Sequence, residues 1–69
     1  MMLKIIGKNC QDFRVNIGKI QSDVSRETNY SIENISAFEN GRNDNCRILM
    51  WYILNGMTSE DLRKGLINE

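Results

Sequence analysis

The sequence contains no histidine, and only two of its 69 residues are cysteines. Without histidine or a Cys-x-x-Cys pair, it lacks the ligand patterns that are typical of structural zinc sites. Cys10 and Cys46 are too few for a disulfide-rich scaffold, and we expect two reduced thiols in core or near-core positions. The sequence therefore predicts no metal and no cofactor.

Long apolar runs, secretory signals and prolines are also missing. The run 48–54 is far shorter than the roughly 18 residues of a membrane helix, so we expect a cytoplasmic protein with no membrane partner. No proline, Gly/Ser-rich linker or internal repeat interrupts the chain. A single domain spanning residues 1–69 is the simplest organisation.

The chain has no excess of charge of either sign, because nine Lys and Arg residues oppose nine Asp and Glu residues. Nucleic-acid binders more often have a basic excess, so composition alone gives no support for that class. Residues 1–20 carry four basic and one acidic side chain, whereas residues 21–45 carry two basic against five acidic ones. No catalytic arrangement is visible, and Glu60-Asp61 fits a charge effect at a helix start. We expect no enzymatic activity.

Apolar spacing predicts five helices and no strand, which makes the chain an all-α domain. The first helix is marked by apolar residues at steps of four, three and four, and Gly18 ends it. These apolar residues are Ile6, Cys10, Phe13 and Ile17. Residues 1–5 are expected to form a lead-in, with a short strand or a dimer contact as the alternatives.

Two short helices should follow, joined by a tight turn. The first covers about residues 21–28 with Val24 inward, and Asn29 suits a turn that requires a positive φ. Ser31 can cap the next helix, which carries Ile35 and Phe38 inward. Asn40-Gly41 ends that helix.

The last two helices complete the expected core. Asn45 can cap a helix that is apolar nearly all round, so we expect it to be buried on more than one side, partly by another subunit. Trp51 and Tyr52 fit core or interface positions better than ligand stacking. Thr58 and Asp61 form a capping box for a final helix. The inward residues of that helix are Leu62 and Leu66.

Taken together, the spacing over residues 6–66 resembles the Cro/cI-type (lambda repressor-like, Xre family) helix-turn-helix domain of phage and bacterial regulators. The end of the third helix resembles the family's aromatic-Glu-Asn-Gly ending very closely, and the joint spacing of all the pieces is more specific than any one of them. The matching positions are Ile6-Gly7 through an outward Arg14, Gly18, Gln21, Val24-Ser25, Ser31, Ile35, Phe38-Glu39-Asn40-Gly41, Gly56-Met57-Thr58 and Leu62. The resemblance implies a compact five-helix fold with a helix-turn-helix at about residues 21–40. Ile20 departs from the pattern, since the family usually has Ser or Thr there.

The resemblance also implies a DNA-binding role for particular residues. A major groove about 12 Å wide admits one helix, whose N-terminal residues meet the base edges. Base-facing positions would be Ile32, Glu33, Asn34 and Ala37, and phosphate positions would be Gln21, Asn40 and Arg42. Ser31 completes this set as the cap.

Each of these positions also has a structural interpretation. Ile32 could belong to the core, and Glu33 could simply stabilise the helix N-terminus by its charge. Glu39 fits an internal partner of Arg14 or of a backbone amide better than a DNA contact.

The resemblance implies a sequence-specific transcriptional regulator, a small Cro-like repressor of a phage or mobile element. Its partner would be a palindromic double-stranded DNA operator, bound by a homodimer that associates through the fourth and fifth helices. An alternative class is a protein-binding adaptor or anti-repressor that uses the acidic helix pair. An autoregulatory antitoxin is a third possibility.

Overall fold

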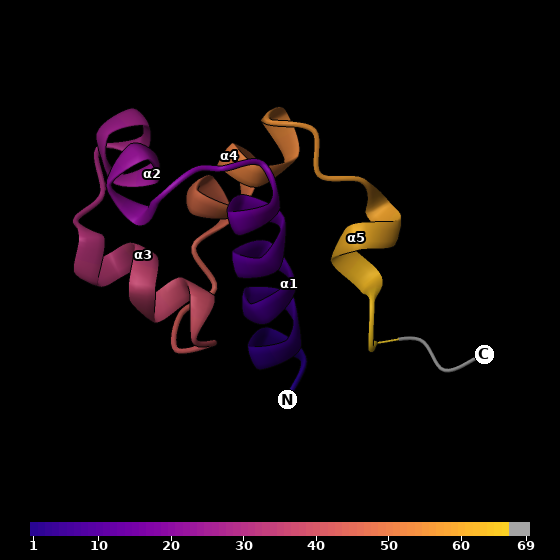
Figure 1. Cartoon of the computed structure of the whole chain (residues 1–69). Coiled ribbons are helices and arrows are strands. Elements are labelled where there is room, and N and C mark those ends of the chain that lie inside the picture. Colours follow the sequence, from indigo (N-terminus) through magenta and orange to yellow (C-terminus); the bar gives the residue numbers. More distant parts are fainter. Residues whose placement is uncertain (67–69) are drawn as a thin grey trace.

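The computed structural model describes residues 1–66, which form five helices and no strand (Figure 1). These residues are all-helical, as the sequence predicts. None of their helices is long and apolar enough to cross a membrane. The helices are α1 (Met2–Asn16), α2 (Gln21–Thr28), α3 (Ile32–Glu39), α4 (Cys46–Leu54) and α5 (Ser59–Arg63).

The expected lead-in over residues 1–5 is wrong, and so is the alternative of a short strand, because α1 begins at Met2. The Ile5 backbone N–H donates to the Met1 carbonyl at 3.1 Å, so the first turn is already helical. Nothing in Met-Leu-Lys-Ile breaks a helix, and three of these residue types are strong helix formers. At the other end, Gly18 adopts φ 76° and ends the helix as expected.

The central helix of the fold is α1, which packs against α3, α4 and α5. In Figure 1, α5 lies on the opposite side of α1 from α2 and α3. The aromatic rings of Phe38 and Tyr52 stack with centroids 5.8 Å apart, and Trp51 meets Tyr52 edge-on at 5.1 Å. The core residues are Cys10, Val24, Ile35, Phe38, Ile48, Trp51, Tyr52 and Met57.

The helix N-termini are capped largely as predicted. Ser31 Oγ accepts from the Asn34 N–H, Asn45 Oδ1 accepts from two N–H groups of α4, and Thr58 and Asp61 form the reciprocal box. Isoleucine at position 20 has no side-chain acceptor for α2. Asp23 instead accepts from the Ile20 backbone N–H at 2.9 Å, and this bond lowers the pKa of the Asp23 carboxyl.

Only one side of α4 is covered by the other residues that the structure describes. Ile48, Trp51 and Tyr52 are buried, but the exposed fractions of Met50, Ile53 and Leu54 are 49%, 47% and 79%. Within the described residues one side of α4 is buried, and the expected cover of its other side by another subunit stays a prediction.

The two cysteines occupy different environments, which corrects the expectation that both lie in or near the core. Cys10 is fully buried, and burial, with a smaller contribution from the nearby Glu39 charge, raises the pKa of its thiol to about 12. Cys46 is exposed at the start of α4.

We therefore predict that a thiol-specific disulfide reagent modifies one cysteine in the native protein and two in concentrated urea. The thiolate is the reactive species, so a buried thiol with a raised pKa reacts only after unfolding. Measuring the released chromophore checks this, with Cys46→Ser as the control that should show no native reaction. A fast second modification without urea would contradict the placement of Cys10.

Candidate nucleic-acid interface

The connection between α2 and α3 is short and held by its own residues. Asn29 adopts φ 66°, the left-handed conformation that its position requires, as predicted. Ser25 Oγ donates to the Tyr30 carbonyl at 2.6 Å, and Thr28 Oγ1 donates to the Val24 carbonyl at 2.7 Å. These bonds fix the path of the turn, so α3 leaves α2 in a defined direction.

The two faces of α3 differ sharply. Ile35, Phe38 and Glu39 are buried, which anchors one face of the helix in the core. On the other side, Ile32 is 45% exposed, so it is not the core residue that one interpretation allowed. Its neighbours Glu33 and Asn34 are exposed as well, and the capping Ser31 adjoins them. The N-terminal turn of α3 thus forms an exposed tip, whose residues are Ser31, Ile32, Glu33 and Asn34.

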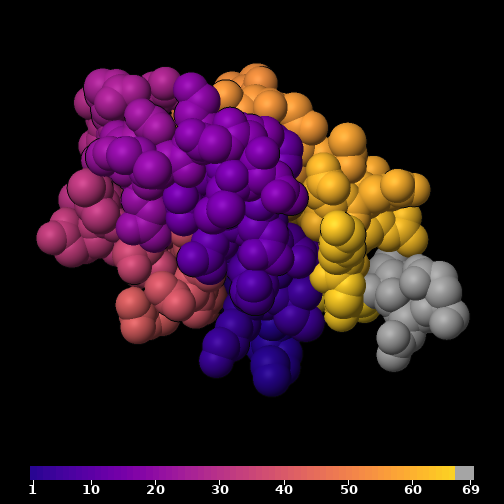
Figure 2. Space-filling model, in the orientation of Figure 1, coloured from indigo at the N-terminus to yellow at the C-terminus, as the bar shows by residue number. Residues whose placement is uncertain are grey.

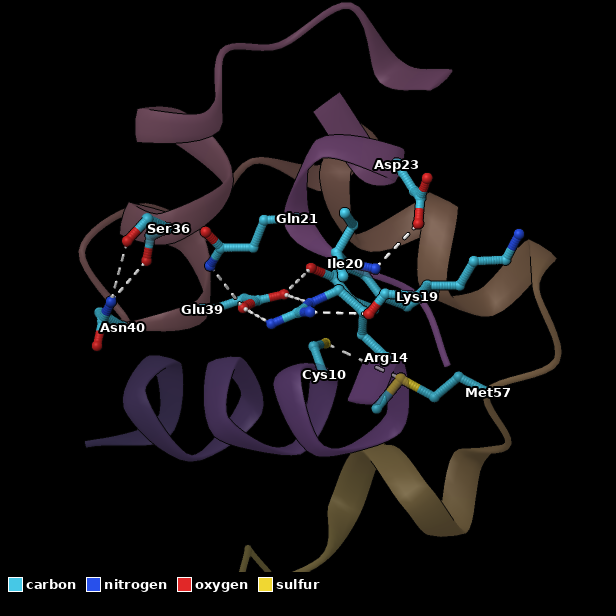
Figure 3. Close-up of polar contacts among 11 residues, drawn as sticks. Cys10, Arg14, Lys19, Ile20, Gln21, Asp23, Ser36, Glu39, Asn40 and Met57 are labelled. Carbon is cyan, nitrogen blue, oxygen red and sulfur yellow. Dashed lines mark hydrogen bonds and ion pairs between the residues drawn. The ribbon is translucent and has the colours of Figure 1, made fainter. Parts of the chain in front are cut away.

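Glu39 is the polar centre of the fold, because its carboxylate accepts four hydrogen bonds from three other helices (Figure 3). Arg14 of α1 donates from Nε to Oε2 at 2.8 Å and from Nη2 to Oε1 at 3.0 Å. Gln21 Nε2 of α2 donates to Oε1 at 3.0 Å, and the Tyr52 hydroxyl of α4 donates to Oε2 at 2.5 Å. The expectation of an internal partner for Glu39 is confirmed.

Arg14 corrects an expectation, since it is not an outward residue of α1. Its exposed fraction is 7%, and its guanidinium also donates from Nη1 to the Lys19 carbonyl at 2.9 Å. The hydrogen bond to Glu39 raises the pKa of Arg14, and burial opposes that effect. Burial, and then the bond to Glu39, raise the pKa of Tyr52. Both shifts favour the protonated forms of Arg14 and Tyr52, which are the forms that donate to Glu39.

Gln21 has an internal role that the sequence did not indicate. Its side-chain amide donates to Glu39, where a phosphate contact was expected. The side chain is half-buried at the start of α2. A variant at Gln21 would therefore disturb the polar centre of the fold as well as any ligand contact.

The remaining predicted positions lie along the exposed side and the end of α3. Ala37 is half-buried, and Asn40 Nδ2 donates to the Ser36 carbonyl at 2.8 Å, which caps the helix end. Arg42 is exposed just beyond, and its side chain makes no hydrogen bond or ion pair with residues 1–66. Among the predicted phosphate-contacting residues, Arg42 is the one whose charged side chain has no partner among residues 1–66.

The acidic character of residues 21–45 is largely satisfied within the molecule. Glu39 is neutralised by Arg14, and Glu27 Oε1 accepts from the Trp51 indole N–H at 2.6 Å. Asp23 caps α2 and pairs with Arg26 at 3.0 Å. The two other acidic residues of this stretch, Glu33 and Asp44, are exposed. The exposed surface of this region is thus less acidic than the sequence count suggests.

Two bridging side chains gave no clear signal in the sequence. Asn9 Nδ2 donates to the Leu62 carbonyl at 2.9 Å and to the Lys64 carbonyl at 2.8 Å, which ties α5 to α1. The indole of Trp51 ties α4 to Glu27 of α2. An apolar pattern does not reveal such pairs, because the partners are 24 to 55 residues apart.

Among residues 1–66, no three His, Cys, Asp or Glu side chains are close enough together to hold a metal ion. Comparisons with protein-family models, with characterised proteins and with solved structures found no match to this chain.

Proposed function

We propose that this protein is a sequence-specific DNA-binding transcriptional regulator of the Cro/cI type, with α2 and α3 acting as a helix-turn-helix. The observation that carries the proposal is the presentation of α3, whose buried face is fixed in the core while its capped N-terminal tip is exposed. A helix presented in this way fits the major groove, where N-terminal side chains meet base edges.

The chemistry of the tip supports base contacts. Ile32 offers an apolar surface for a thymine methyl, Glu33 an acceptor for cytosine N4, and Asn34 an amide that can pair with adenine. Beyond the helix end, Arg42 supplies a free cation for a backbone phosphate. With few cations nearby, we expect modest affinity and a shallow dependence on salt.

The DNA prediction is tested with binding sites selected from a random duplex pool at two salt concentrations. We expect Arg42→Glu to weaken binding by about tenfold or more and to reduce the salt slope by about one, because one phosphate contact becomes a repulsion. Asn34→Ala should weaken binding and relax the preference at one base pair, by about 1–3 kcal/mol. Mobility-shift titrations provide both readouts.

Arg63→Glu is the matched control, because it reverses an exposed charge on α5, which lies across α1 from α3. Its affinity should stay within about twofold of the parent. Circular dichroism must show unchanged helicity for all three variants. If the parent protein binds no selected duplex at about 50 mM salt, where phosphate contacts are strongest, the proposal fails.

The proposal includes a two-fold dimer, because palindromic half-sites about 34 Å apart require two copies. The exposed apolar side chains of α4 support this helix as the interface: Met50, Ile53 and Leu54. Leu62 of α5 packs against the core instead, so α5 offers less apolar surface for association than expected.

We accordingly predict that Leu54→Asp shifts the protein from dimer to monomer, because a desolvated carboxylate would face apolar residues of the partner. Sedimentation equilibrium measures the change. Val15→Asp is the control, since it places the same charge at an apolar position of α1 that is 60% exposed. A parent protein that remains monomeric at high concentration would rule out this interface.

A further inference from the structure

A second surface feature lies away from α2 and α3, in the groove between the N-terminal half of α1 and the end of α5. The groove has a volume of about 660 Å³. In Figure 2, α5 lies directly alongside the indigo half of α1. One wall of the groove is formed by the first turns of α1 and the residue before it. Its residues recur at helical spacing and so form one continuous stripe: Met1, Lys4, Ile5, Lys8 and Asn9.

The walls of the groove are held in place by hydrogen bonds between α1 and the end of α5. Asn9 donates to the Leu62 and Lys64 carbonyls, which fixes the end of α5 against α1. Gly65 then turns away with φ 80°, close enough to Ile5 that an added Cβ would meet Ile5 Cγ2 at 3.4 Å. A groove built this way is preformed, so a ligand need not order it.

The rim of the groove is basic although the chain as a whole has no net charge. Lys4 and Lys8 border it on α1, Lys64 borders it at the end of α5, and no carboxylate of the described residues lines it. Lys8 pairs with Asp12 at 3.1 Å, but both partners are exposed and that pair is weak. The lysine stems extend the apolar floor, while their ammonium groups remain at its edge.

We propose that this groove binds an amphipathic helix of a partner protein, whose apolar stripe is flanked by Asp and Glu residues. Helix-in-groove recognition uses apolar anchors at spacings of three and four, and the α1 stripe has the same spacing. From Met1 to Asn9 the stripe extends about 12 Å, which matches two turns of a docked helix. The lysine rim complements flanking carboxylates and disfavours basic helices.

The proposal does not depend on DNA binding. In Figure 1, α1 lies between α5 and α3, so a helix docked beside α5 leaves the exposed tip of α3 free. The partner would therefore be recognised whether or not DNA is bound.

The test is an NMR titration of the isotopically labelled full chain with a synthetic peptide of about four helical turns. The peptide carries leucines at spacings of three and four, with glutamates on both sides of that stripe. A second peptide has lysine in place of every glutamate. We expect the acidic peptide to shift amide signals in the first half of α1 and in α5, and the basic peptide to bind at least about tenfold more weakly.

Two double variants distinguish binding in the groove from a general attraction between the acidic peptide and the basic side chains of the protein. Lys4→Glu/Lys64→Glu should weaken acidic-peptide binding about tenfold, because two attractions become repulsions. Lys19→Glu/Arg47→Glu has the same net charge but leaves the groove intact, so it should change affinity less than about twofold. Asn34→Ala, which should weaken DNA binding without changing the charge, should keep peptide affinity. Circular dichroism confirms that each variant is folded.

The proposal is overturned if the acidic peptide fails to bind, if its signals shift on α3 or α4 instead, or if both double variants bind alike. It is also overturned if decanoate shifts the groove signals and the peptide does not, since the groove would then take a small amphiphile.

Discussion

Replacing Glu39 by glutamine is expected to lower the free energy of unfolding by about 3–5 kcal/mol, although it removes no volume from the core. The glutamine amide carries no charge, so the buried Arg14 guanidinium loses its counter-ion. The amide also has one acceptor oxygen, whereas the Glu39 carboxylate offers two oxygens to the same donors. A 69-residue chain has a total stability of roughly 3–10 kcal/mol, so this variant would be close to unfolded at room temperature. Urea unfolding followed by circular dichroism measures the loss.

Asp12→Asn is the matched control, because it also removes one carboxylate from an ion pair. The Lys8–Asp12 pair has a similar 3.1 Å separation, but its side chains are 68% and 57% exposed. Exposed pairs contribute about 0–1 kcal/mol, so this variant should unfold near the parent midpoint. Equal losses in the two variants would contradict the special role of Glu39.

A double-mutant cycle separates the ion pair from its surroundings. Arg14→Met with Glu39→Leu removes both charges together, so neither is left buried and unpaired. We expect the double variant to be more stable than the sum of the single losses predicts, by about 1–3 kcal/mol. Additive losses would mean that the two side chains act independently.

Local signals made much of the helical layout predictable. Asn29, Ser31, Asn45 and the Thr58–Asp61 pair each act within a few residues of their own position, and each lies in the conformation that its chemistry favours. The sequence could also predict an internal partner for Glu39. What it could not predict is that three helices would send donors to that one carboxylate, because those contacts depend on packing between segments far apart in the chain.

The sequence pattern did not predict the first turn of α1, and this omission also concealed the groove beside α5. Met1, Lys4, Ile5 and Lys8 share a face only if residues 1–5 are helical, so a lead-in there hides the groove beside α5. Apolar spacing begins clearly at Ile6, and the earlier residues are apolar on several sides. Periodicity alone does not decide such a segment.

The exposed tip of α3 was predicted from a resemblance, and burial now gives it a physical basis. Ile32 is about half exposed beside Glu33 and Asn34, whereas Ile35 is fully buried. Gln21 shows where the sequence misleads, because its amide faces Glu39. A side chain at a helix N-terminus is equally suited to an internal acceptor and to an external one.

Gly7→Ala is expected to lower the free energy of unfolding by about 2–3 kcal/mol, the opposite of what helix propensity predicts. In an open helix the change would stabilise by about 1 kcal/mol. Here an added Cβ would lie 2.5 Å from the Phe38 carbonyl oxygen and 2.6 Å from that of Glu39. These are backbone atoms, so α1 and the end of α3 would have to separate, which strains the packing around Glu39 as well.

Three further alanine variants separate the effect of this close approach from the effect of a positive φ, which is the other reason for a glycine at a given position. Gly18 has φ 76° and nothing within 4 Å of an added Cβ, so alanine there should cost only the left-handed strain of about 1–2 kcal/mol. Gly41 combines φ 77° with a Cβ position 2.5 Å from Lys4 Cα, and should lose the most. Gln11→Ala, at an exposed position of α1, should change stability by less than about 0.5 kcal/mol.

The urea midpoints of these variants rank their losses of stability. The order of the losses shows whether close approach and backbone strain contribute separately. If Gly7→Ala is as stable as the parent or more so, α1 and α3 are not in the contact described. If Gly7→Ala loses stability while Gly18→Ala loses less and Gly41→Ala more, close approach and backbone strain act as separate contributions. The contact between α1 and the end of α3 then fixes both Glu39 and the direction in which the tip of α3 is presented.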